Sequence, residues 1–225
     1  MNKRIFSLIL CCIALFALCA VGQAEATDDY LAQIAGSYVE LFPEMDREEY
    51  RDAWIAGVTP LVGEENAEAT VDMLIGMCCA EIYGDEAIAQ YAADPASMRF
   101  DCYFLGGVEQ FTVDGNTISG TDAEGNVVFS HDYVRMDVDG ESDFIFYQSE
   151  DADAGQFTYF AFSPDTMATT WHLEFRYSEN LEDLYSWFEG AYAYWNAAGI
   201  AADYTDEDMC SAIELFATEN LSEAE

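Results

Sequence analysis

The sequence predicts a mainly β protein, an antiparallel barrel that follows a helical segment and is closed by C-terminal helices. Turn signals recur roughly every ten to fifteen residues between positions 98 and 177, among short runs of β-branched and aromatic residues. Apolar residues at helical spacing come before and after that stretch. Antiparallel meanders of this length curl into barrels or sandwiches. The spacing of apolar residues changes from helical to strand-like near residue 97, and this change marks where the barrel is expected to begin.

Length and composition indicate one folded domain. The chain has 225 residues, of which 15% are aromatic, and so much ring area requires a core. We find no internal repeat or linker and expect a single domain over 27–225. It would contain a helical segment at about 28–95, the barrel at about 98–177 and helices at about 179–221.

The helical segment is predicted from two apolar stripes, separated by breakers at Pro43 and at 60–63. The stripes are Tyr30, Ile34, Tyr38 and Leu41, and then Val71, Leu74, Ile75 and Cys78. At the other end, 181–195 is aromatic-rich and reads as helical, and Thr205 with the acidic residues after it caps a last helix to about Asn220.

The barrel strands are predicted between turns at 114–116, 123–126, 139–142 and 152–155. Each turn is rich in glycine, asparagine or acidic residues, which accept turn conformations. The predicted strand runs are Gln110–Val113, Val127–Ser130, Phe144–Gln148 and Phe157–Phe162.

The N-terminus reads as a cleavable secretory signal over residues 1–26. Two cations precede an apolar run from Ile5 to Val21, and Ala24 and Ala26 give the small-residue pattern that signal peptidase accepts. An uncleaved anchor or a lipid on Cys19 are the alternatives, but the run is short for a bilayer span. We expect a secreted or extracytoplasmic protein, at the cell surface or in the periplasm, with no membrane insertion after signal removal.

The formal net charge is −37, which excludes nucleic acid and anionic lipid as partners and draws cations to the surface. Beyond the signal every cation is an arginine. Solubility is the simpler explanation of this acidity, and collection of metal ions is the alternative. Cys78, Cys79, Cys102 and Cys210 remain after the signal, so one of the adjacent pair could bridge to Cys102 or to Cys210. No CxxC spacing supports a thiolate zinc site.

Polar and apolar residues alternate strictly in the segment 170–177, and this pattern makes His172 the main candidate for a metal ligand. In a strand, His172, Glu174 and Arg176 share one face, and aromatic and aliphatic residues share the other. One interpretation places the apolar face in the core and leaves the polar face solvated. The other places the polar face in the barrel lumen, where an imidazole and a carboxylate two residues apart could ligate zinc.

Several stretches resemble the ZinT (YodA) family of exported zinc-binding proteins with a lipocalin-like (calycin) barrel. The resemblance rests on the order and spacing of 34–43, 129–133, 157–165, 172–175, 181–195 and the helix after Thr205. In that family one histidine after a Phe-Ser-Asp motif and a later His-x-His pair bind zinc. The resemblance therefore implies a Zn²⁺-binding domain that buffers the metal or delivers it to an uptake system.

Carried over by position, the family's ligands correspond to Asp165, His172 and Glu174, and only His172 keeps the family's residue type. The gap between positions 165 and 172 is shorter than usual, the histidine-rich loop is absent, and Arg176 could satisfy Glu174 without metal. Two interpretations follow. Either the site has become a more oxygen-rich one that also tolerates other divalent cations, or it has decayed.

Other functions are weighed against metal binding. His131 could add a ligand if it reaches the lumen, and no phosphate loop or nucleophile elbow points to an enzyme, so we expect none. The alternatives are a lipocalin-type binder of a small apolar ligand, lined by residues such as Phe144, Phe146 and Tyr159, and a surface interaction domain without a ligand.

Overall fold

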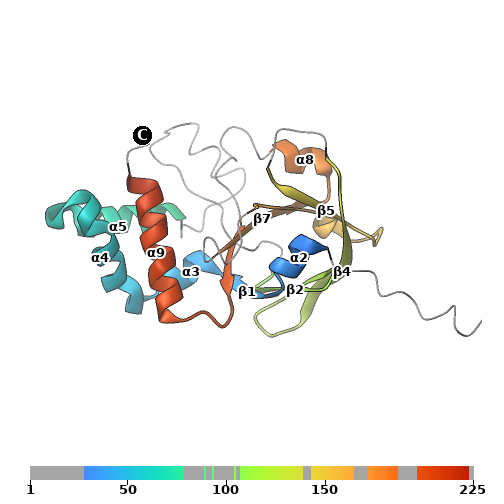
Figure 1. Ribbon diagram of the computed structural model, residues 1–225, viewed down its shortest axis with the longest axis horizontal. Helices are drawn as coiled ribbons and strands as arrows, with labels where there is room; N and C mark the ends of the chain where they lie inside the picture. The colour runs from blue at the N-terminus through green and yellow to red at the C-terminus, as the bar shows by residue number, and fades with distance from the viewer. Residues whose placement is uncertain are drawn as a thin grey trace, which may run out of the picture.

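The computed structural model describes residues 28–78, 107–138, 143–164, 172–186 and 197–222, together with Ala89, Ala93 and Phe104. Eight antiparallel strands form a closed barrel in chain order, and the last strand pairs with the first (Figure 1). They are β1 (Gly36–Glu40), β2 (Gln110–Asp114), β3 (Thr117–Thr121), β4 (Val127–Arg135), β5 (Ile145–Ser149), β6 (Tyr159–Phe162), β7 (Leu173–Ser178) and β8 (Ala197–Ala201). The prediction of an antiparallel barrel with helices on both sides in sequence is confirmed.

The barrel interior is filled by aromatic side chains. One buried cluster draws members from all eight strands, and only the inner surface of a closed barrel can bring them together. Phe111, Phe160 and Phe175 have ring centroids 4.7 to 6.0 Å apart, within the range of edge-on and tilted ring contacts. This packing leaves the alternate residue of each strand on the outside.

A second core lies outside the barrel, where four helices gather beside it (Figure 1). The helices are α3 (Leu41–Met45), α4 (Arg51–Val62), α5 (Glu64–Cys78) and α9 (Asp206–Leu221), with the 3₁₀ turn η1 (Glu48–Tyr50) before α4. Trp54 is fully buried there, and its indole N–H donates to the carbonyl of Met45 at 2.9 Å. Ala198 and Ile200 join this core from β8, so it anchors the helices to the barrel.

Two shorter helices and a turn complete the described fold. Helix α2 (Asp29–Gln33) enters the barrel core through Tyr30 and Leu31, and η3 (Gly155–Phe157) joins β5 to β6. Helix α8 (Leu181–Ser186) packs through Leu184 on Phe146 and Ala161, on the outer face of β5 and β6.

Two strands lie where helix was predicted. Tyr38 was expected on a helical stripe but lies in β1, because its side chain faces the barrel interior and its backbone pairs with β2 and β8. β8 lies within the expected C-terminal helices. Its Gly199 fits a closely packed position, since a Cβ there would lie 3.1 Å from the Phe104 ring and from the Tyr38 Cβ.

Other predictions have mixed outcomes. The cap of the last helix is confirmed, because Thr205 and Asp208 form a reciprocal capping box. A disulfide to Cys210 was wrong, since Cys210 is an exposed free thiol. Cys79, Cys102 and the predicted signal segment lie outside the described residues. Among the residues that are described, no helix is long and apolar enough to span a membrane.

Candidate metal centre

Strand β7 presents its aromatic face to the interior and its polar face to the outside. Leu173, Phe175 and Tyr177 belong to the buried interior cluster, so Glu174 and Arg176 point outward. The interpretation that placed the polar face in the lumen was wrong. The aromatic side chains occupy the lumen because burying them removes far more apolar area from water than burying the polar face would.

His172 and Glu174 lie side by side on the outer face where β7 begins. The His172 Nε2 and Glu174 Oε1 atoms are 3.3 Å apart, and the two side chains are 14% and 32% exposed. Two ligands of a tetrahedral zinc ion, each bonded at about 2.0 to 2.1 Å, are separated by roughly 3.3 Å. The pair therefore has the spacing of two zinc ligands and is open to solvent on one side. The same spacing allows an ion pair when the imidazole is protonated.

The two strands that flank β7 belong to different apolar cores on the outside of the barrel, the helical core at β8 and the cluster under α8 at β6. The Ser163 N–H donates to the backbone carbonyl of Glu174 at 2.9 Å, and Ala198 of β8 pairs with Glu174 on the other side. Ala198 belongs to the helical core, whereas Ala161, two residues before Ser163, packs under α8. Because β6 and β8 are both part of packed cores, the backbone of β7 that carries His172 and Glu174 is fixed between them.

Arg176 is the nearest cation along this face. It is 3% exposed, and its guanidinium carbon lies 6.0 Å from the Phe144 ring centroid, a cation–π contact. It stands two residues after Glu174 on the same face and opposite Ala161 of β6. A buried positive charge there opposes the arrival of a dication.

Two of the three predicted ligands are brought together. Asp165 lies outside the described residues, and the part of the chain that is described contains no group of three or more His, Cys, Asp and Glu side chains arranged to hold a metal ion. His131, the predicted extra ligand, has its Nδ1 2.8 Å from Asp151 Oδ2 and its ring stacked near Phe129.

The alternative apolar site is not in the barrel. Phe146 is buried in the outer cluster under α8, and Phe144 and Tyr159 pack against that cluster rather than lining the lumen. The prediction that these residues line a cavity in the barrel lumen was wrong, because all three belong to or pack against the outer cluster. On β5 and β6, Phe146 and Tyr159 alternate with the interior-facing Tyr147 and Phe160.

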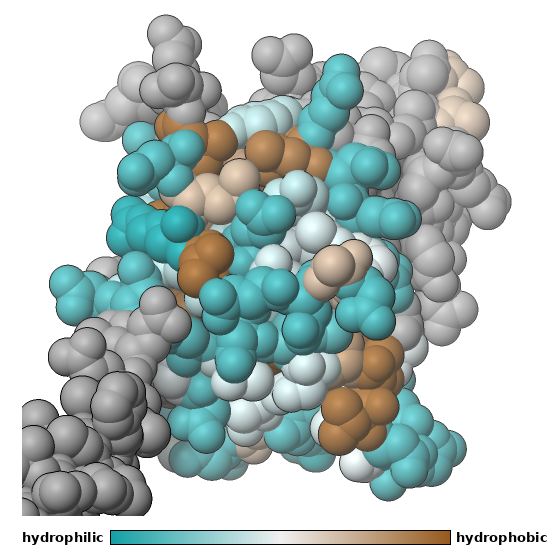
Figure 2. Space-filling view, turned by 90° about the vertical axis from the view of Figure 1, so that its right-hand side faces the viewer, coloured by the Kyte–Doolittle hydropathy of each residue, from teal (hydrophilic) through white to brown (hydrophobic). Residues whose placement is uncertain are grey.

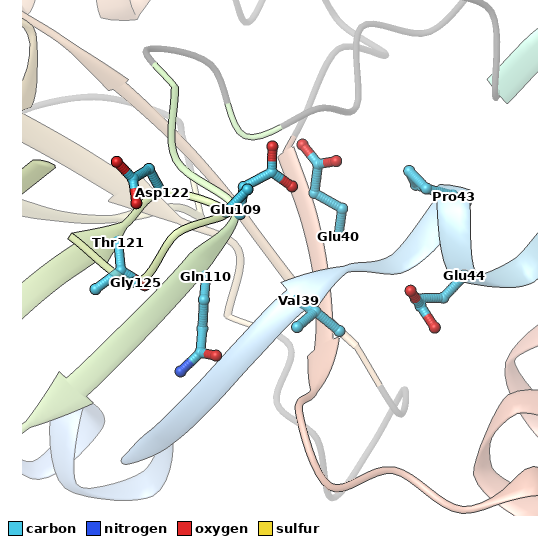
Figure 3. A pocket seen from close by; sticks show the side chains of 10 residues that line it. Val39, Glu40, Pro43, Glu44, Glu109, Gln110, Thr121, Asp122 and Gly125 are labelled. Atoms are coloured by element: carbon cyan, nitrogen blue, oxygen red, sulfur yellow. The ribbon is translucent and has the colours of Figure 1, made fainter. Parts of the chain in front are cut away.

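An acidic cavity of about 360 Å³ lies between β1, α3 and the β2–β3 strands. Its carboxylates are Glu40, Glu44, Glu109 and Asp122. Figure 3 shows the carboxyl groups of Glu40 and Glu109 pointing toward each other. Burial raises the pKa of Glu40 to about 7; the Phe104 N–H that it accepts lowers this pKa, and the nearby Glu109 raises it. Among the described residues that line this cavity, every ionisable side chain is a carboxyl group, so no cation of the lining offsets the effect of burial.

Sequence reasoning missed this cavity. Glu40 falls in a stretch predicted as helix, and it comes near Glu109 and Asp122 only because β1 pairs with β2 and β2 with β3. The dense acidity of the chain was visible, but no spacing along the sequence connects these three residues.

Comparison with solved structures identifies the fold. No family model and no curated protein sequence matches the chain. The Zn(II)-bound ZinT-like domain of AdcA from Streptococcus pneumoniae matches with a TM-score of 0.51 and 14% identity, over 85% of this chain and 93% of that domain. The chain has the fold of a ZinT-like domain. Zn(II)-bound AdcA from the same organism gives a TM-score of 0.45 at 15% identity, covering 89% of this chain and 37% of AdcA.

Proposed function

We propose that this ZinT-like fold binds zinc outside the cytoplasm, to buffer the ion or to deliver it to an uptake system. The observation that carries the proposal is the 3.3 Å between His172 Nε2 and Glu174 Oε1 on the rim of β7. A neutral imidazole nitrogen beside a carboxylate oxygen is a ligand combination that zinc favours over purely oxygen sites. The solved ZinT-like domain of the same fold is Zn(II)-bound, which supports the same ligand class here.

Asp165 is the proposed third ligand. The β6–β7 ladder pairs Phe162 with Phe175. β6 ends at Phe162, and Asp165 follows in the segment that leaves the strand next to β7. A carboxylate there would extend the pair across two strands and leave the fourth tetrahedral position to water.

The ligand types set the expected strength and selectivity. One imidazole and two carboxylates bind zinc more loosely than three imidazoles and tolerate harder ions such as manganese and calcium. The acidic surface attracts any dication, whereas the buried Arg176 on the same face opposes it. We therefore propose weak, calcium-sensitive zinc binding suited to buffering and release.

A zinc titration tests the proposal. The protein, purified without chelator or affinity metal, is titrated by calorimetry as wild type, as His172→Ala and as His131→Ala. Loss of the single imidazole ligand is expected to weaken zinc binding roughly a hundredfold. His131→Ala removes the other histidine, which pairs with Asp151, and should leave the affinity unchanged. Equal affinities for wild type and His172→Ala, or an equal loss in both variants, would refute the assignment.

A further inference from the structure

Strand β4 extends beyond its partner β5 and leaves an open edge. It pairs with β3 along Val127–Asp132, but its register with β5 covers only Tyr133–Arg135. One further bond joins the Glu150 N–H to the carbonyl of Asp132, at 2.8 Å. Among the described residues, no strand pairs with 127–131 on that side. A sheet edge of this kind is a template for one more strand.

The backbone direction shows which groups face the open side. The Tyr133 N–H donates to Asn116 on the β3 side, whereas the carbonyl of Asp132 accepts from Glu150 on the β5 side. Because the direction alternates along a strand, the N–H and C=O of Ser130 face the same side as those of Asp132. Ser130 is an exposed residue on this stretch, so we place the contact with a partner strand there.

Exposed valines flank this edge. Of the five large hydrophobic residues exposed in the described chain, three lie on β4, namely Val127, Val128 and Val134, at 67%, 37% and 40%. The barrel side of the molecule is otherwise mostly hydrophilic, with small separate hydrophobic patches (Figure 2). The strand therefore offers apolar contacts beside its open backbone groups.

Carboxylates stand at both ends of the open edge. Asp122 and Glu124 lie in the turn before β4, while Asp132 and Glu150 mark the point where β5 begins to pair. The ladder with β3 also contains a bulge near Val127, which adds local twist. Like charges oppose pairing with a second copy of this chain, which would bring the same carboxylates to this edge.

From this placement we propose that the edge at Val127–His131 binds an extended segment of a partner protein by strand addition. The segment carries a basic residue at each end and apolar or hydroxyl side chains between them. Backbone bonds to Ser130 supply affinity, the valines supply contact area, and the terminal carboxylates select the charge. This interaction is separate from zinc binding, which occurs on β7.

A synthetic peptide tests the proposal. The probe is fluorescein-labelled Arg-Val-Thr-Val-Thr-Val-Arg-amide, and the full protein is titrated into it while fluorescence anisotropy is recorded. Ser130→Pro removes the outward N–H without removing a bond to β3, and Ser130→Ala is its matched control. We expect Ser130→Pro to weaken binding at least tenfold, and Ser130→Ala and His172→Ala to bind as wild type does.

Two further probes keep the test decisive if Ser130→Pro perturbs folding. A peptide of the same sequence with alternate amides N-methylated cannot add as a strand, and one with glutamate at both ends carries the wrong charge. Both should bind at least tenfold more weakly than the probe. Equal binding of the methylated peptide, no binding of the probe at millimolar concentration, or dimerisation of the protein through this edge in sedimentation velocity would each overturn the proposal.

Discussion

The two faces of strand β7 have different roles, although their residues alternate along six positions of one chain segment. The inner face carries Phe175, 1% exposed and surrounded by other rings of the barrel. The outer face carries Glu174, whose carboxylate lies beside His172 and remains partly exposed. Stability and metal binding should therefore be separable by substitutions one residue apart. The first predictions below test that separation.

The largest effect is expected on the inner face. Phe175→Ala should lower the free energy of unfolding by about 3 to 5 kcal/mol, because it leaves a cavity among close-packed rings. Urea denaturation followed by circular dichroism measures the change. Glu174→Ala, on the opposite face, is the matched control and should change stability by less than about 1 kcal/mol. Similar losses in both variants would show that the two faces are not distinct.

A smaller effect is expected on the outer face. Glu174→Gln keeps the shape of the side chain but replaces a charged ligand with a weak neutral one, so zinc affinity should fall about tenfold. Urea unfolding of the metal-free protein should be nearly unchanged. Competition with a chromogenic zinc chelator measures the affinity, and retention of wild-type affinity would exclude Glu174 as a ligand.

Features that depend on residues close in sequence could be predicted. One is the turn at 114–116, where Gly115 adopts a positive φ of 63°. Another is the cap of the last helix, which Thr205 forms with a residue three positions later. β1 could not be recognised because Ile34, Tyr38 and Leu41 happen to recur at helical spacing. Apart from Ile200, β8 consists of alanine and glycine, which have little strand preference. It is a strand because barrel closure brings β1 and β7 to its edges.

The candidate site could be predicted only in part from the sequence. The period of a strand places His172 and Glu174 on one face, and the structure brings them together. The strand period does not determine which face points inward. The buried interior cluster decides it, because the aromatic face of β7 packs against aromatic residues from β1, β2, β4, β5 and β6. The cluster of Glu40, Glu109 and Asp122 could not be foreseen, since it depends on the register of three strands.

The acidic cavity differs from the His172–Glu174 pair on β7, because burial there raises the pKa of one lining carboxyl group, Glu40. The pKa of Glu40 in the folded protein is about 7, above its ordinary value of 4.5. The folded state therefore binds the proton more tightly, so this contribution to stability is complete below about pH 4.5 and is lost as the pH rises towards 7.

Glu40→Gln should remove this pH dependence while keeping an acceptor for the Phe104 N–H. At pH 8 the variant should be more stable than wild type by about 1 to 2 kcal/mol, after allowance for solvent screening of a partly exposed group. At pH 4 the two proteins should unfold at nearly the same urea concentration. An identical pH profile for both proteins would contradict the assignment.

The smallest effect is expected far from both faces of β7. Thr205→Ala removes the hydroxyl that accepts the Asp208 N–H and should cost about 1 kcal/mol of stability. Zinc affinity should not change. A thermal melt and a zinc titration of the same variant check both statements, and a loss of zinc affinity would show that α9 influences the metal site.

The most direct test of the central claim is zinc K-edge X-ray absorption on the protein loaded with less than one equivalent of zinc. We predict a first shell of nitrogen and oxygen at about 2.0 Å with outer-shell scattering from a single imidazole. His172→Ala should abolish that imidazole signal, and His131→Ala should preserve it. A shell without imidazole in the wild type, or an imidazole signal that survives His172→Ala, would contradict the account.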